Sequence, residues 1–120
     1  MIEIHIFDRS RDKQPVGAGS VLFREGDPAT AMYAVIEGEV EVVVGDQVVE
    51  VVGPAGIVGE MALMDHQPRS ATARARTDCV VVAIEERQFL FLVDEHPTFA
   101  LQVMRTMADR LRKQSHPVVA

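Results

Sequence analysis

Residues 59–75 combine residue types that hold a small anion in proteins. Gly59 can adopt the positive φ that turns the chain sharply, and a helix that begins directly after it leaves its first amides without intrahelical partners. Those amides and the helix dipole favour an anion. Arg69 adds a planar guanidinium that matches two phosphate oxygens and stays ionised in a partly buried site. The pattern predicts a site for one phosphate group, with amides from Glu60, Met61 and Ala62.

Glu60 and the neighbours of Arg69 refine this prediction. A carboxylate beside a phosphate is repulsive unless it is aimed elsewhere, and a sugar hydroxyl is a suitable hydrogen-bond donor to Glu60. Small side chains at Ala62, Ser70 and Ala71 leave room for an anion next to the backbone, and Ser70 could add a donor. Glu60 and Arg69 taken alone would suggest a surface ion pair with each other. The surrounding residues favour the binding of a sugar phosphate instead.

Two five-residue segments carry a resemblance to a known family. Gly-Glu-Met-Ala-Leu at 59–63 and Pro-Arg-Ser-Ala-Thr at 68–72 resemble the phosphate-binding cassette of the cyclic-nucleotide-binding domain, including the spacing of nine positions between Glu60 and Arg69. Catabolite activator protein and the regulatory subunit of protein kinase A contain this domain. Residues 21–28 and 32–40 resemble the family's other two signatures, so the match extends over about residues 16–112.

The resemblance implies both a fold and a set of ligand contacts. The fold is mainly β: an eight-stranded antiparallel β-roll of the jelly-roll type, with a short cassette helix and two C-terminal helices. The implied ligand is a cyclic mononucleotide. The implied ligand-binding residues are Gly59, Glu60, Met61, Ala62, Arg69, Ser70 and Ala71.

The resemblance also bears on the base of the nucleotide. In this family a threonine directly after the arginine can favour guanine, whereas alanine or serine is typical of adenine binders, so Ser70 implies cyclic AMP and leaves cyclic GMP as the alternative. Val58 stands where the family often has an aromatic residue, and the chain has no tryptophan that could cap a base. A lid would then come from the last helix, where the candidates are Met104, Arg105, Met107 and Arg110.

The periodicity of apolar residues changes once along the chain. Short apolar runs alternate with turn signals up to about residue 84, and helical spacing replaces them afterwards. This order predicts a β-roll over about residues 13–84 and helices at about 85–94 and 98–114, while Pro68 is expected to stop the cassette helix. The alternating Ile2, Ile4 and Ile6 favour one more strand before the roll. The expected strands are 4–7, 13–16, 21–24, 32–36, 39–44, 47–52, 69–75 and 79–84.

Length and composition predict a single domain, residues 1–120. The formal net charge of -6 argues against a general nucleic-acid surface, although one mononucleotide responds mainly to the local field.

No apolar run approaches the length of a membrane span, and the N-terminus lacks the basic start of a secretory signal, so a cytoplasmic protein is expected. The single cysteine, Cys79, lies in an apolar run and is expected to pack in the core.

Catalysis and metal binding have little support in the sequence. The four histidines have no metal-ligand spacing, and no serine lies in a nucleophile-elbow sequence. No enzyme activity, metal or cofactor is therefore expected apart from the nucleotide ligand. The histidines are His5, His66, His96 and His116.

Two functions from different classes remain. The first is a stand-alone sensor in which cyclic AMP binds the roll, the last helix moves, and an unidentified downstream protein reads the change. The second is a ligand-independent interaction or dimerisation module that retains the fold. Glu60 and Arg69 favour the sensor, because a pocket without a ligand does not require them. The interface of the second hypothesis, which includes a possible homodimer, is the helical stripe of Phe99, Val103, Met107 and Leu111. Such a stripe more often packs in the chain's own core, and a helix this short makes a weak coiled coil by itself.

Overall fold

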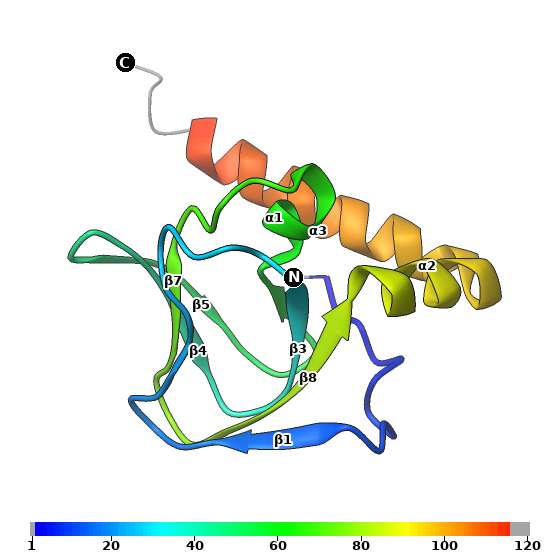
Figure 1. Cartoon of the computed structure of the whole chain (residues 1–120), viewed down its shortest axis with the longest axis horizontal. Helices are drawn as coiled ribbons and strands as arrows, with labels where there is room; N and C mark the ends of the chain where they lie inside the picture. Colours follow the sequence, from blue (N-terminus) through cyan, green and yellow to red (C-terminus); the bar gives the residue numbers. More distant parts are fainter. Residues whose placement is uncertain (1, 116–120) are drawn as a thin grey trace.

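The computed structural model describes residues 2–115, which form eight strands and three helices (Figure 1). The strands are β1 (Lys13–Val16), β2 (Val21–Phe23), β3 (Ala31–Glu37), β4 (Val40–Val44), β5 (Gln47–Val52), β6 (Ile57–Val58), β7 (Thr72–Ala75) and β8 (Cys79–Glu85). The helices are α1 (Glu60–Asp65), α2 (Glu86–Glu95) and α3 (Pro97–Ser115). Within residues 2–115, none of the helices is both long and apolar enough to cross a membrane.

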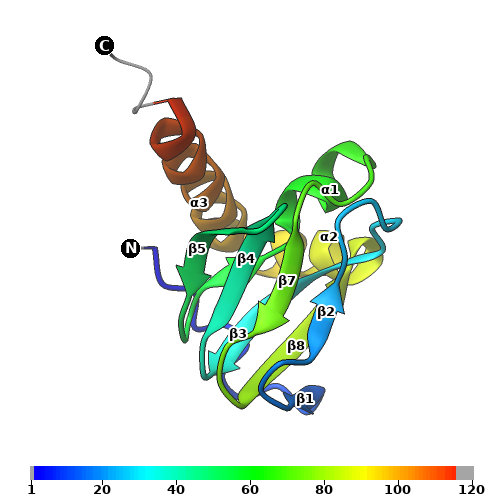
Figure 2. The ribbon, with the colours of Figure 1, turned by 90° about the vertical axis from the view of Figure 1, so that its left-hand side faces the viewer.

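The strands form two four-stranded sheets in the orders β1-β8-β3-β6 and β2-β7-β4-β5, and all their pairings are antiparallel. In Figure 2 the second sheet faces the viewer, and the first sheet lies behind it. Helices α2 and α3 follow the roll and pack on the outer face of the β1-β8-β3-β6 sheet. The predicted eight-stranded β-roll with a short helix and two C-terminal helices is therefore confirmed.

The central strands β3 and β8 are buried on both faces. Met32 of β3 packs toward the helices, whereas Val35 of the same strand packs between the two sheets together with Val81 of β8. Burial on both faces explains why residues 79–84 form an almost continuous apolar run without the alternation of a strand that faces water. Cys79 lies in the core between the sheets, as expected, and is 3% exposed.

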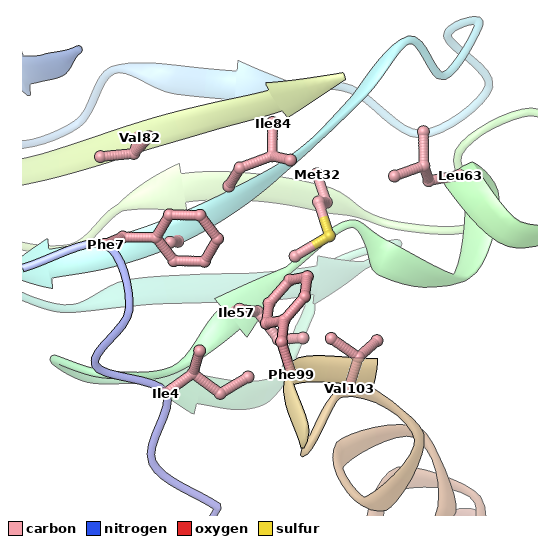
Figure 3. Close-up of a cluster of buried hydrophobic side chains, with 10 residues drawn as sticks. Ile4, Phe7, Met32, Ile57, Leu63, Val82, Ile84, Phe99 and Val103 are labelled. Atoms are coloured by element: carbon pink, nitrogen blue, oxygen red, sulfur yellow. The ribbon is translucent and has the colours of Figure 1, made fainter. Parts of the chain in front are cut away.

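Helix α3 is anchored by its N-terminal half. Phe99 and Val103 are each 1% exposed and pack among the side chains shown in Figure 3. The Phe99 ring lies 5.5 Å from the ring of Phe7 and 5.4 Å from that of Phe89, between centroids. Pro97 suits the first position of the helix, because its φ is preset and its missing amide hydrogen would have no intrahelical partner. The first turns of α3 thus belong to the core of the domain.

This anchoring agrees with core packing for the apolar stripe on α3 and counts against the stripe as the interface of the alternative hypothesis. Phe99 and Val103 are buried in the chain's own core, and Met107 packs partly against it. An α-helix has about 3.6 residues per turn, so side chains spaced four residues apart do not stay on one face. The stripe therefore turns from the core at Phe99 toward solvent at Leu111. The apolar side chains that α3 does expose are Leu101, Met104 and Leu111.

The strand expected at residues 4–7 is also wrong. Turns occupy residues 6–9, where the amide of Asp8 donates to the His5 carbonyl at 3.1 Å and that of Ser10 to the Phe7 carbonyl at 3.0 Å. Ile4 and Phe7 are the buried residues, a spacing of three that the alternating isoleucines did not indicate. The eighth strand is instead β6, whose two residues are too few to show a periodicity.

Two boundaries near the cassette differ from expectation. Strand β7 begins at Thr72 rather than residue 69, because the Arg69 backbone pairs with the loop after β2: its amide donates to Asp27 and its carbonyl accepts from Gly26, both at 2.8 Å. Helix α1 ends at Asp65, before Pro68 is reached. His66 stops it by adopting a left-handed conformation, with φ of 57°.

Candidate functional site

One pocket collects all seven residues that the sequence assigned to ligand binding. It lies between the N-terminus of α1, the segment before β7, the strands β4 and β5, and the C-terminal half of α3. Glu60 and Arg69, which are nine positions apart in the sequence, both line it. The predicted residues that line the pocket are Gly59, Glu60, Met61, Ala62, Arg69, Ser70 and Ala71.

Gly59 makes the turn that begins α1. Its φ of 80° and ψ of 10° lie in the left-handed region that favours glycine, and no side chain caps the helix. A Cβ atom at this position would lie 2.6 Å from Nη1 of Arg69 and 3.0 Å from Cε2 of Phe23. The turn therefore requires glycine both for its backbone conformation and for the close approach of these two side chains.

Arg69 is buried, with 5% of its surface exposed, and carbonyl oxygens hold its guanidinium. Nη1 donates to the Gly59 carbonyl at 2.9 Å, and Nη2 donates to the Ala31 carbonyl. Nε has no hydrogen-bond partner among the described residues. Burial lowers the pKa of Arg69 from its ordinary value, but a guanidinium remains ionised at neutral pH. The site thus contains a buried positive charge whose Nε–H remains available as a hydrogen-bond donor.

Glu60 is the second buried charge, with 1% of its surface exposed. Its Oε1 accepts a hydrogen bond from Nη1 of Arg110, whereas its Oε2 has no partner within residues 2–115. The ion pair between Glu60 and Arg69 that would have made this pair purely structural does not occur among the described ion pairs. Glu60 pairs with a residue fifty positions away, on another element.

Arg110 connects α3 to the pocket through two carboxylates. Besides Glu60, it binds Glu50 of β5, with Nε 2.9 Å from Oε1 and Nη2 3.1 Å from Oε2. Burial on its own would lower the pKa of Arg110, but the charges of Glu60 and Glu50 outweigh it and raise the pKa above its ordinary value. Arg110 is therefore held as a cation at the inner face of α3.

The four lid candidates on α3 differ in position. Only Arg110 among them lines the pocket. Met104 and Arg105 are exposed, and Met107 packs partly against the core on the other side of the first sheet. The chemistry that α3 presents to the pocket is thus a guanidinium and not an apolar cap.

Several lining residues were not predicted from the sequence. Phe23 of β2 lies against Arg69, and Glu50 holds Arg110. A signal for Glu50 existed, because it is a charged residue in the middle of a valine-rich strand. Phe23 has no such signal, because an aromatic residue in a short strand is ordinary. The lining also contains four valines that were not predicted, Val42, Val44, Val49 and Val58.

The remaining side chains considered in the sequence are Ser70, Thr72 and the possible metal ligands. Ser70 is exposed at the rim of the pocket. The Thr72 hydroxyl accepts a hydrogen bond from the Glu25 amide at 3.0 Å, which ties β7 to the loop after β2. No group of three or more histidine, cysteine, aspartate or glutamate residues is placed to hold a metal ion in the described part of the chain.

Comparison with protein families gives one match that covers most of the chain. Residues 13–96 match the family model described as the cyclic nucleotide-binding domain. The matched segment contains both sheets, α1 and α2, and hence every pocket residue except Arg110.

Individual relatives agree with the family match. The chain is 38% identical over 80 residues to a cAMP-dependent protein kinase regulatory subunit from Eremothecium gossypii, covering 67% of this chain and 18% of that protein. A solved structure of the catabolite activator protein from Thermus thermophilus superimposes with a TM-score of 0.76 and 31% identity, over 85% of this chain and 50% of that one. A structure described under a cyclic-GMP-dependent signalling pathway of bacterial phytopathogenesis gives a TM-score of 0.77 and 26% identity, over 90% and 92% of the two chains. The chain spans at most 34% of the length of the first three curated relatives that it matches.

Proposed function

This chain belongs to the cyclic nucleotide-binding domain family, and from that premise we propose that it binds cyclic AMP and acts as a sensor through its C-terminal helix. Domains of this family are binding modules, and the proposal assigns no catalytic step to the domain. The phosphate would bind Arg69 and the first amides of α1, and the ribose hydroxyl would bind Glu60.

One observation carries this proposal: two buried, oppositely charged side chains line the same pocket, and each has one polar atom without a partner in the described chain. These atoms are Nε of Arg69 and Oε2 of Glu60. Buried polar atoms are rarely left unpaired in proteins, because their desolvation is then not compensated. A cyclic nucleotide supplies both missing partners, since its phosphate accepts from a guanidinium and its ribose hydroxyl donates to a carboxylate.

The apolar wall of the pocket suits the base. Valine side chains from β4 and β5 lie in the lining with Glu60 and Arg69, where they could contact the faces of a purine ring. Ser70, directly after the arginine, supports adenine by the resemblance described above. Relatives associated by name with cAMP and with cyclic GMP are both among the matches, so the two nucleotides must be compared directly.

Arg110 supplies a route from the pocket to α3. A ribose hydroxyl bound at Oε2 of Glu60 would share that carboxylate with Arg110, which binds Oε1 and is also held by Glu50. A ligand shifts a conformational equilibrium only through contacts that differ between the two states. The contact at Glu60 is of that kind, because the ligand and α3 share one carboxylate.

A calorimetric titration of cyclic AMP and cyclic GMP into the protein tests the proposal. The protein is first unfolded and refolded, because nucleotide carried through purification would fill the pocket. An occupied pocket would give no binding heat and would be mistaken for a pocket that cannot bind. We expect saturable heat for one nucleotide per chain, with cyclic AMP binding more tightly. Tighter binding of cyclic GMP would contradict the choice of base, and the absence of heat with both nucleotides, from refolded protein with native circular dichroism, would contradict the sensor.

The exposed side of α3 supports one alternative, an interaction or dimerisation module. Leu101, Met104 and Leu111 are 43%, 56% and 51% exposed, at spacings that place them along one side of the helix. This alternative predicts a dimer in analytical ultracentrifugation without nucleotide, which Met104→Glu dissociates and Leu90→Glu, a matched change on α2, does not. A monomer at every concentration would count against it.

A further inference from the structure

The guanidinium of Arg69 is held without any carboxylate. Its hydrogen bonds go to two backbone carbonyls, of Gly59 and Ala31, and none of the described ion pairs includes it. A carboxylate would hold the side chain equally well but would cancel the charge that an anion needs. The carbonyls contribute only dipoles, so no hydrogen-bonded carboxylate offsets the charge of the guanidinium.

An aromatic ring completes the surroundings of this guanidinium. The central carbon of Arg69 lies 4.0 Å from the centroid of the Phe23 ring, within the range of a cation–π contact. The ring face attracts the cation through its quadrupole and covers one side of it against water. Like the carbonyls, it stabilises the charge without neutralising it.

Three features fix the Phe23 ring in place. Tyr33 stacks on it, with centroids 6.0 Å apart and planes 27° apart. Gly59 leaves the space that the ring edge occupies, since a Cβ there would lie 3.0 Å from it. The pairing of β2 with β7 shifts register between Val21 and Phe23, an irregularity of the kind that redirects a side chain.

From this arrangement we infer that Phe23 is a positioning residue for phosphate recognition: its ring orients the Arg69 guanidinium before the ligand arrives. The inference rests on the phosphate role proposed for Arg69. Preorganisation is useful here because a free arginine side chain loses considerable rotamer entropy when it is ordered, and the ring and carbonyls meet that cost during folding. Phe23 touches the arginine and acts on the ligand through it.

The test compares Phe23→Leu with Phe23→Tyr, which retains the ring, and with Phe91→Leu, the same change at an exposed position of α2. Affinity for cyclic AMP is measured by calorimetry, and the Nε–H resonance of Arg69 is followed by NMR without ligand. We expect Phe23→Leu to weaken binding about tenfold, with the tyrosine variant and the α2 control near wild type. We also expect the resonance to move downfield when the shielding ring is lost.

A double variant separates positioning from general packing. In an Arg69→Gln background the further change Phe23→Leu should cost no additional affinity, because the ring then has no guanidinium to orient. Wild-type affinity in folded Phe23→Leu, or an equal loss in the Arg69→Gln background, would overturn the inference. If the parent protein binds neither cyclic nucleotide, the proposed function fails, and the NMR resonance still tests the contact between the ring and Arg69: an unchanged resonance in Phe23→Leu overturns the inference too.

Discussion

Arg69→Ala is expected to weaken cyclic nucleotide binding by about 2 to 5 kcal/mol, the range for removing one member of a buried charged pair. The phosphate would then enter a pocket that has lost the guanidinium of Arg69, which pairs with no carboxylate among the described ion pairs, and backbone amides would remain as donors to the phosphate. Calorimetry on the refolded variant measures the loss. The chain should remain folded, because the main core clusters do not include Arg69.

Two further variants make this result specific. Glu60→Ala should cost less affinity than Arg69→Ala, since it removes a contact with a neutral hydroxyl and leaves the phosphate site in place. Arg76→Ala is the matched control, because Arg76 is an exposed arginine that contacts Glu39 at 3.9 Å and does not line the pocket. Unchanged affinity in both pocket variants would show that the nucleotide binds elsewhere.

Arg110→Ala is expected to destabilise the ligand-free domain by about 3 to 5 kcal/mol, because it leaves a buried carboxylate without its partner. Glu60 is almost fully buried, and the arginine side chain that pairs with it is 15% exposed, so solvent screens the pair only weakly. Urea unfolding followed by circular dichroism measures the free energy of unfolding. The loss should exceed that of any exposed ion pair on the same helix.

A second substitution tests whether the unpaired charge of Glu60 causes this loss of stability. Glu60→Gln introduced into Arg110→Ala should restore part of the stability, because the uncompensated charge disappears while the shape of the side chain is kept. Lys113→Ala provides the control: Lys113 lies on α3, contacts Asp109 at 3.2 Å and is 72% exposed, so its removal should cost less than about 1 kcal/mol. Equal stability of Arg110→Ala and the parent would contradict the role given to the Glu60 contact.

The cassette could be predicted from the sequence because its parts are local. A glycine that requires positive φ, a short helix and an arginine a few residues later are close along the chain, and the backbone alone brings them to one place. The strands buried on both faces could also be predicted, since residues 79–84 and 32–36 are apolar runs of strand length. In both cases the pattern and the physical cause occupy the same segment.

The contacts across the pocket could not be predicted in this way. Arg110 was one of four candidates, and its selection depends on how α3 docks, which the packing of Phe99 and Val103 in the core determines. The contact of Phe23 with Arg69 depends on a register shift between β2 and β7. Such features arise from tertiary packing of segments that are distant in the sequence, so no local pattern encodes them.

Phe99 and Arg110 lie on the same helix, so a tilt of α3 about Phe99 displaces Arg110. Phe99 is fixed in the core, and Arg110 lies about 16 Å further along the axis at 1.5 Å per residue. A rotation of about 10° around the Phe99 end would displace the Arg110 end by nearly 3 Å, by this same helix length, enough to break a hydrogen bond. A changed contact between Arg110 and Glu60 can therefore be accommodated by tilting the C-terminal half of α3, while the core around Phe99 stays intact.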